Sequence, residues 1–261
     1  MMLKKNAQIS VFVIIAIIAV IIGTFIIFTQ SDDSSTQTID TSTRDSQDLS
    51  SIQQDIEKCT EIATKNTILF NLRQGGFTHV PNQFVTHNAL QIPLYVVQSV
   101  EDIPTLDVLE EELDLSLHEE FFLCLQNFTS YKDAGFQVSF NDVNFSTDFI
   151  ENRIDTNTTF PITIVDPDKK SISLDFFTTQ TSFDVVSKFN IISEFLEYHR
   201  NDPNSIPLSY LNELSQTYDF RYELLPQNNQ TIIYSFQFNE LNTNEESEFN
   251  FAIMYDWEVS Q

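Results

Sequence analysis

The sequence predicts an α+β protein in which an N-terminal transmembrane helix and a flexible stalk precede helices packed with antiparallel sheet. Three patterns carry this prediction. Residues 9–29 are apolar and uncharged, as a membrane-spanning helix requires. Apolar residues recur every three or four positions in 51–73 and 105–128, the spacing of amphipathic helices. Short runs that alternate apolar and polar residues fill much of the remainder, as β-strands do.

The membrane segment reads ISVFVIIAIIAVIIGTFIIFT over residues 9–29. A helix of this length spans about 30 Å, the thickness of the hydrocarbon core of a bilayer. Lys4 and Lys5 precede it and Asp32 and Asp33 follow it, which places the N-terminus in the cytoplasm and the rest outside the cell membrane. The alternatives are a buried soluble helix and a cleaved secretory signal, although the FIIFTQSDD that follows makes a poor cleavage site.

Acidic residues dominate the chain. It has 38 Asp and Glu against 13 Lys and Arg, a formal net charge of −25. Such a surface repels phosphate backbones, so we expect no nucleic-acid partner. The charge suits solubility, a salty exterior or weak binding of divalent cations, and it does not choose among them. With 41% hydrophobic residues and 24 Phe, most of the chain can build a folded core.

Four segments follow from these patterns: a basic leader and anchor helix (1–30), a disordered polar stalk (31–50), a helical unit with a short β piece (51–130) and an α+β domain (131–261). The stalk has too few apolar residues to offset the entropy lost on ordering. The helix after it can begin with a capping box of Ser51 and Gln54, and Gly75-Gly76 ends it.

The second helix of the helical unit covers about 105–128, with Thr105 as its N-cap. Between the helices we expect extended pieces at 77–80 and 90–97. Because Pro93 lacks an amide hydrogen, the second piece is predicted to be an edge strand.

The α+β domain is expected to end in an antiparallel meander with helices on one face. Its predicted strands are 136–140, 162–165, 172–176, 220–225, 231–239 and 249–257, and its predicted helices cover 185–199 and a shorter stretch from Pro207.

Cys59 and Cys124 are the only cysteines, and both follow the predicted membrane segment, where disulfides persist. Each lies on the apolar stripe of a predicted helix, so packing of the two helices would bring the sulfurs together. A disulfide is therefore the favoured interpretation, and two separately buried thiols are the alternative. Without a CxxC motif or a neighbouring His, we expect no redox or nucleophilic role.

Motifs for catalysis are missing from the sequence. Only four glycines occur, too few and wrongly placed for a P-loop, a dinucleotide-binding turn or a nucleophile elbow. The histidines His79, His87, His118 and His199 form no HExxH pair, and the runs Glu110–Glu112 and Glu245–Glu246 match no calcium loop. We interpret these histidines as surface or helix-face residues and the acidic runs as solvated faces. The prediction is a chain with no enzyme activity, catalytic residue, cofactor or metal site.

N-x-[ST] sequons occur at Asn127, Asn144, Asn157 and Asn229. Chance alone predicts about as many in a chain of this composition, so they are acceptable sugar sites and no more.

The residues Lys4-Lys5-Asn6-Ala7-Gln8-Ile9-Ser10, directly before the apolar run, resemble the class III signal segment of archaeal pilin-like proteins. The resemblance implies that a peptidase cuts between Ala7 and Gln8. Assembling pilins usually carry Glu at the fifth mature position, where this chain has Phe12, so it would lack an ion pair within the membrane.

A wider resemblance joins Cys59, Gln74-Gly75-Gly76-Phe77 and Cys124-Leu125 to uncharacterised archaeal single-pass surface proteins. It implies location and architecture and carries no activity. We therefore expect a structural or interaction module at the cell surface, with a surface protein of unknown identity as partner and the lipid bilayer bound through residues 9–29. The alternatives are a minor pilin-like subunit and an exported hydrolase.

Overall fold

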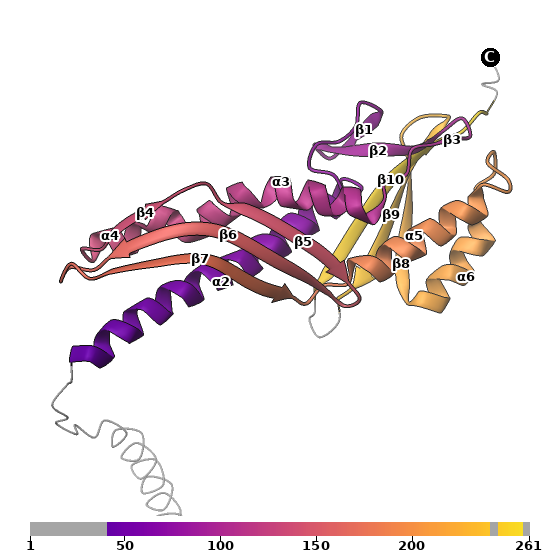
Figure 1. Ribbon diagram of the computed structural model, residues 1–261. Coiled ribbons are helices and arrows are strands. Elements are labelled where there is room, and N and C mark those ends of the chain that lie inside the picture. The colour runs from indigo at the N-terminus through magenta and orange to yellow at the C-terminus, as the bar shows by residue number, and fades with distance from the viewer. Residues whose placement is uncertain (1–40, 241–244, 258–261) are drawn as a thin grey trace, which may run out of the picture. The chain divides into compact units, whose positions relative to one another are not determined.

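The computed structural model describes residues 41–240 and 245–257, in which helices pack against two sheets (Figure 1). The predicted membrane segment 9–29, the proposed cleavage site at Ala7 and Gln8, and residues 31–40 of the predicted stalk lie outside the described residues. Within the described part, no helix combines the length and the apolar character needed to cross a bilayer.

Helix α2 (Thr41–Arg73) begins before the predicted position. Residues 41–50, which we expected to belong to a disordered stalk, are helical, and this expectation was wrong. Composition alone suggested disorder because the stretch is polar. Once residues 51–73 are packed, however, extending the helix adds one hydrogen bond per residue and needs no new nucleus.

The described residues from 49 onward form one compact unit. The boundary expected near residue 130 therefore does not separate two domains. The reason is the pairing of strand β2 (Leu90–Val97) with β10 (Glu246–Met254), which joins the two expected segments in one sheet.

The larger sheet has six strands in the order β1-β2-β10-β9-β8, with β3 added beside β2. The predicted antiparallel meander is present as β8, β9 and β10, but β2 joins it in parallel, so the sheet is mixed. The prediction that Pro93 makes its strand an edge was wrong, because β2 lies between β1 and β10. The strands not yet bounded are β1 (Phe84–His87), β3 (Val100–Glu101), β8 (Phe220–Pro226) and β9 (Thr231–Asn239).

The smaller sheet is built around β6 (Arg153–Val165). Strand β7 (Ser171–Thr181) pairs along one edge of β6, while β4 (Gln137–Phe140) and β5 (Asn144–Ile150) follow one another along the other edge. Helix α2 lies against this sheet, with the Thr64 hydroxyl 3.3 Å from that of Thr156 in β6.

The remaining helices are α3 (Leu106–Leu125), the 3-10 turn η1 (Gln126–Phe128), α4 (Thr129–Asp133), α5 (Val185–His199) and α6 (Leu208–Tyr218). The predicted N-cap of α3 is confirmed, because the Thr105 side chain accepts a hydrogen bond from the Val108 amide. Helix α5 covers the larger sheet, where its Phe195 packs against Tyr234 of β9 and Phe251 of β10. The predicted extended piece at 77–80 is not a strand.

Cys59 of α2 and Cys124 of α3 form a disulfide, with an S–S distance of 2.08 Å and a Cα–Cα distance of 5.5 Å. Near the other end of α2, the Thr78 hydroxyl donates to the Asn71 side chain, whose amide lies 3.5 Å from the Ser116 hydroxyl of α3. The predicted pairing of these two helices and their cysteines is thus confirmed.

Replacing both cysteines with serine should destabilise the unit. The disulfide joins residues 65 apart in sequence, and closing such a loop is worth about 4 kcal/mol in the chain-entropy model. Chemical denaturation of the Cys59→Ser/Cys124→Ser chain should show a free energy of unfolding lower by about that amount. Adding a reductant should destabilise the wild-type chain and leave the variant unchanged, and equal unfolding midpoints with and without reductant in the wild type would refute the assignment.

Candidate functional site

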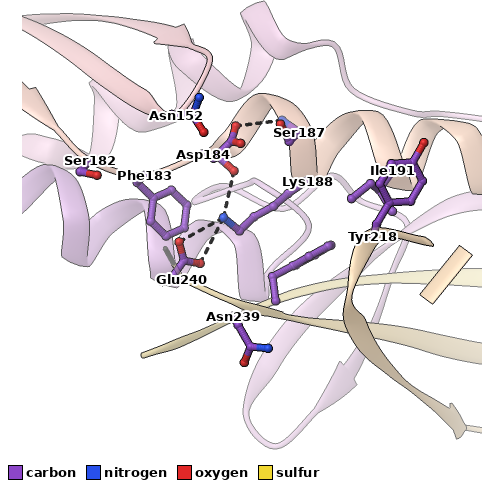
Figure 2. Close-up of a pocket in the computed structure, with 11 residues that line it drawn as sticks. Asn152, Ser182, Phe183, Asp184, Ser187, Lys188, Ile191, Tyr218, Asn239 and Glu240 are labelled. Carbon is purple, nitrogen blue, oxygen red and sulfur yellow. Dashed lines mark hydrogen bonds and ion pairs between the residues drawn. The ribbon is translucent and has the colours of Figure 1, made fainter. Parts of the chain in front are cut away.

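A polar pocket of about 350 Å³ lies where the β5–β6 turn, the start of α5 and the end of β9 meet (Figure 2). Its lining residues are Asn152, Ser182, Phe183, Asp184, Ser187, Lys188, Ile191, Tyr218, Phe238, Asn239 and Glu240. Hydroxyl, amide and charged groups converge there from three parts of the chain. Such convergence makes the pocket the first place to look for chemistry.

Lys188 is buried at the centre of this pocket. Its Nζ donates to the Asp184 carbonyl at 2.9 Å and to Glu240 Oε2 at 3.2 Å, and it lies 3.1 Å from Glu240 Oε1. It also lies over the Phe183 ring, 4.2 Å from the centroid. Burial lowers the pKa of the Lys188 ammonium, and the charge of Glu240 opposes this shift. The ammonium stays paired because an unmatched buried charge is costly.

Local structure explains how these groups meet. The Asp184 side chain caps α5 by accepting from the Ser187 amide at 3.0 Å, which fixes the first turn of the helix. This places the Asp184 carbonyl one turn below Lys188, while β9 delivers Glu240 just after Asn239 (Figure 2).

Two charged groups of this pocket, Lys188 and Glu240, neutralise each other. The Lys188 ammonium donates to the Asp184 carbonyl and to Glu240 Oε2 and is ion-paired with the Glu240 carboxylate, so this amine is neither a free base nor a nucleophile. The pair therefore fastens α5 to the end of β9. Sequence reasoning did not single out either residue, although Lys188 falls on the apolar stripe of α5 between Val185 and Ile192, which is an unusual place for a charge.

The acidic run of α3 is not the solvated face that we expected. Glu110 accepts from the Phe149 amide at 2.6 Å, and Glu112 accepts from the amides of Thr78 and His79 at 3.0 and 2.9 Å. These carboxylates bond to backbone amides of the β5 edge and of the loop that follows α2, which is why they are not free in solvent.

Asp114 extends the same pattern. Its Oδ1 accepts from the backbone amide of Thr147 at 2.9 Å and from the Thr147 hydroxyl at 2.8 Å. Together with Glu110 it covers the edge of β5 that faces away from β6. Burial raises the pKa of Asp114 to about 6, while the two hydrogen bonds from Thr147 oppose that shift.

The four histidines do not converge. His79 and His118 are exposed and His87 is half-buried, whereas His199 is buried in α5. Burial lowers the pKa of His199, and its Nε2 has no hydrogen-bond partner. Among the residues that the structure describes, no three His, Cys, Asp or Glu side chains are grouped so as to hold a metal ion.

Comparison with family models, with curated proteins and with solved structures finds no match to this chain.

Substitution of Lys188 by Met should be costly, because it leaves the Glu240 carboxylate buried without its cation. We expect a loss of about 3 kcal/mol or more in the free energy of unfolding, measured by urea denaturation. The double variant Lys188→Met/Glu240→Met should be more stable than the single one.

The matched control for that substitution is Lys65→Met, which removes the more exposed pair of Lys65 and Glu245 and should cost less than about 1 kcal/mol. Equal losses for the Lys188 and Lys65 variants would contradict the proposed role of the buried pair.

Asp114→Asn should change the pH dependence of stability. The pKa of Asp114 is raised from its ordinary value of 3.8 to about 6, so the folded state holds the proton more tightly. The stabilisation from this group is complete below the unfolded pKa and is lost as the pH rises through about 6. Relative to wild type, the amide variant should therefore gain stability as the pH rises from about 4 to about 6 in urea denaturation, with little further change above about pH 7. Exposed Asp133→Asn serves as the control, and parallel pH curves for wild type and Asp114→Asn would count against the assignment.

Proposed function

We propose that this chain is a membrane-anchored extracytoplasmic protein whose folded unit serves as a structural or interaction module at the cell surface. The observation that supports it most is the disulfide between Cys59 and Cys124, because disulfides persist in oxidising surroundings outside the cytoplasm. The uncharged run 9–29 with lysines before it and aspartates after it supplies the anchor and its orientation.

The use of the ionisable groups favours an interaction module over an enzyme. Lys188 and Glu240 neutralise each other, and Glu110, Glu112 and Asp114 bond to backbone amides. These five groups are among the buried or half-buried ones that an active site could draw on, and each of them has a structural partner. The proposal is therefore a non-enzymatic role with a protein or another envelope component as partner.

A minor pilin-like subunit is the second candidate. It rests on the motif from Lys4 to Ser10, with cleavage between Ala7 and Gln8. Mass spectrometry of the mature N-terminus tests it directly, since cleavage leaves a chain that starts at Gln8 and an intact Met1 or Met2 excludes processing.

Charges placed in the middle of residues 9–29 should abolish anchoring. Ile17→Lys with Ile18→Lys adds about 3 kcal/mol per residue to the free energy of insertion. A C-terminally tagged wild-type chain should stay with the membrane after salt washing and lose its tag to protease added to intact cells. The double lysine variant should lose both properties, and Ile17→Leu/Ile18→Leu should keep them. A tag that is protected on intact wild-type cells would refute the orientation.

A further inference from the structure

A second pocket, of about 730 Å³, opens between the C-terminal half of α3, the turn η1 and the link between β4 and β5. These elements lie at the end of the smaller sheet in Figure 1. The pocket is lined by His118, Glu119, Phe122, Asn127, Phe140, Asn141 and Asp142. Its size is within the range of small-ligand sites in proteins.

Two aromatic rings form part of the wall of this pocket. The centroids of Phe122 and Phe140 are 5.5 Å apart with the ring planes tilted by 31°. Both rings pack on Phe160, at 5.9 and 5.4 Å, and Phe160 is fully buried. Phe140 keeps 38% of its surface exposed. The result is an aromatic surface that is held from beneath and still open to a ligand.

The polar side chains of the pocket have no hydrogen-bond or ion-pair partner among the described residues. Among residues 41–240 and 245–257, no hydrogen bond or ion pair is made by the side chains of His118, Glu119, Asn127, Asn141 and Asp142. The His118 ring packs on Phe122, with the ring centroids 4.8 Å apart. The carboxylates of Glu110, Glu112 and Asp114, on the same helix, are all bonded internally. The pocket therefore contains free hydrogen-bond donors and acceptors, whereas these other carboxylates of α3 are already hydrogen-bonded within the protein.

The kind of ligand follows from the lining. No Lys or Arg lines the pocket and two carboxylates do, which disfavours an anion. The amides of Asn127 and Asn141 donate and accept, whereas the carboxylates only accept. An organic cation would use the rings and carboxylates but leave the amides idle. A sugar ring has an apolar C–H face that can pack on Phe140 and hydroxyls that both donate and accept, so it matches the whole set.

We propose that this pocket binds a residue of a neutral saccharide, with its C–H face on Phe140 and its hydroxyls bonded to Asn141 and Asp142. The proposal goes beyond a general interaction role because it names a ligand class and a site. Binding in solution does not depend on where the chain is located in the cell. Failure of the binding test thus leaves the membrane proposal standing, and the reverse also holds.

The test uses the full chain in a detergent without a sugar head group. Because Asn127 begins a sequon, the chain is produced in a bacterial host that attaches no N-linked sugar. The probes are maltose, cellobiose and N,N′-diacetylchitobiose at millimolar concentration, with saturation-transfer difference NMR as the readout. At least one probe should receive saturation from the protein.

Variants locate the binding. Phe140→Ala and Asn141→Ala should each lower the affinity for the probe about tenfold, which is the loss expected for one contact of about 1.4 kcal/mol. Phe84→Ala is the matched control, because Phe84 is also 38% exposed but lies in β1, and it should bind as wild type does. If Phe140→Ala lowers the unfolding midpoint, Asp142→Asn replaces it, since that change keeps the side chain's shape.

Three results would overturn the proposal. One is the absence of saturation transfer to all three saccharides. Another is a bound saccharide whose affinity is the same in Asn141→Ala and Asp142→Asn as in wild type. The third is binding of choline, the organic-cation probe, by a chain that binds none of the saccharides, which would assign the pocket to a cation.

Discussion

The turn at the end of α2 is the constraint on which the rest of the unit depends. Gly75 and Gly76 both have positive φ, at 64° and 84°, which glycine adopts without strain. A Cβ on Gly76 would lie 2.2 Å from Leu109 of α3, and one on Gly75 would lie 2.4 Å from Pro93 of β2. Tyr95 of β2 donates to the Gly75 carbonyl at 2.7 Å. One turn therefore fixes α2, α3 and the larger sheet relative to one another.

Helix α3 divides its polar residues between two tasks. In its N-terminal half, Glu110 and Asp114 accept hydrogen bonds from backbone amides at the edge of β5. Without these bonds, the free amides could pair with a strand of another chain. The C-terminal half of α3 is tied to α2 by the disulfide of Cys124, and the side chains of His118 and Glu119 line the second pocket. The free polar groups of the saccharide pocket lie on the half of the helix whose polar side chains do not bond to the backbone of β5.

Sequence patterns predicted the elements with apolar faces and missed those with threonine faces. Strand β9 and helix α5 match their predicted limits because their buried residues are apolar. Strand β5 and the first half of β6 went unpredicted, since Thr147, Thr156 and Thr158 occupy buried positions there and read as polar. The pocket around Lys188 could not be predicted either, because its ion pair joins positions 52 residues apart.

The net charge and the saccharide pocket act over different distances. A charge of −25 acts over about 8 Å at physiological salt, so it steers a basic macromolecular partner and repels an acidic one before contact. A neutral saccharide feels little of this field and is selected only by contacts within the pocket. Affinity that falls steeply with added salt would therefore report the charged surface, and affinity that stays constant would report the pocket. A module with both features can attract a basic partner protein through its net charge and hold an envelope glycan through contacts within the pocket.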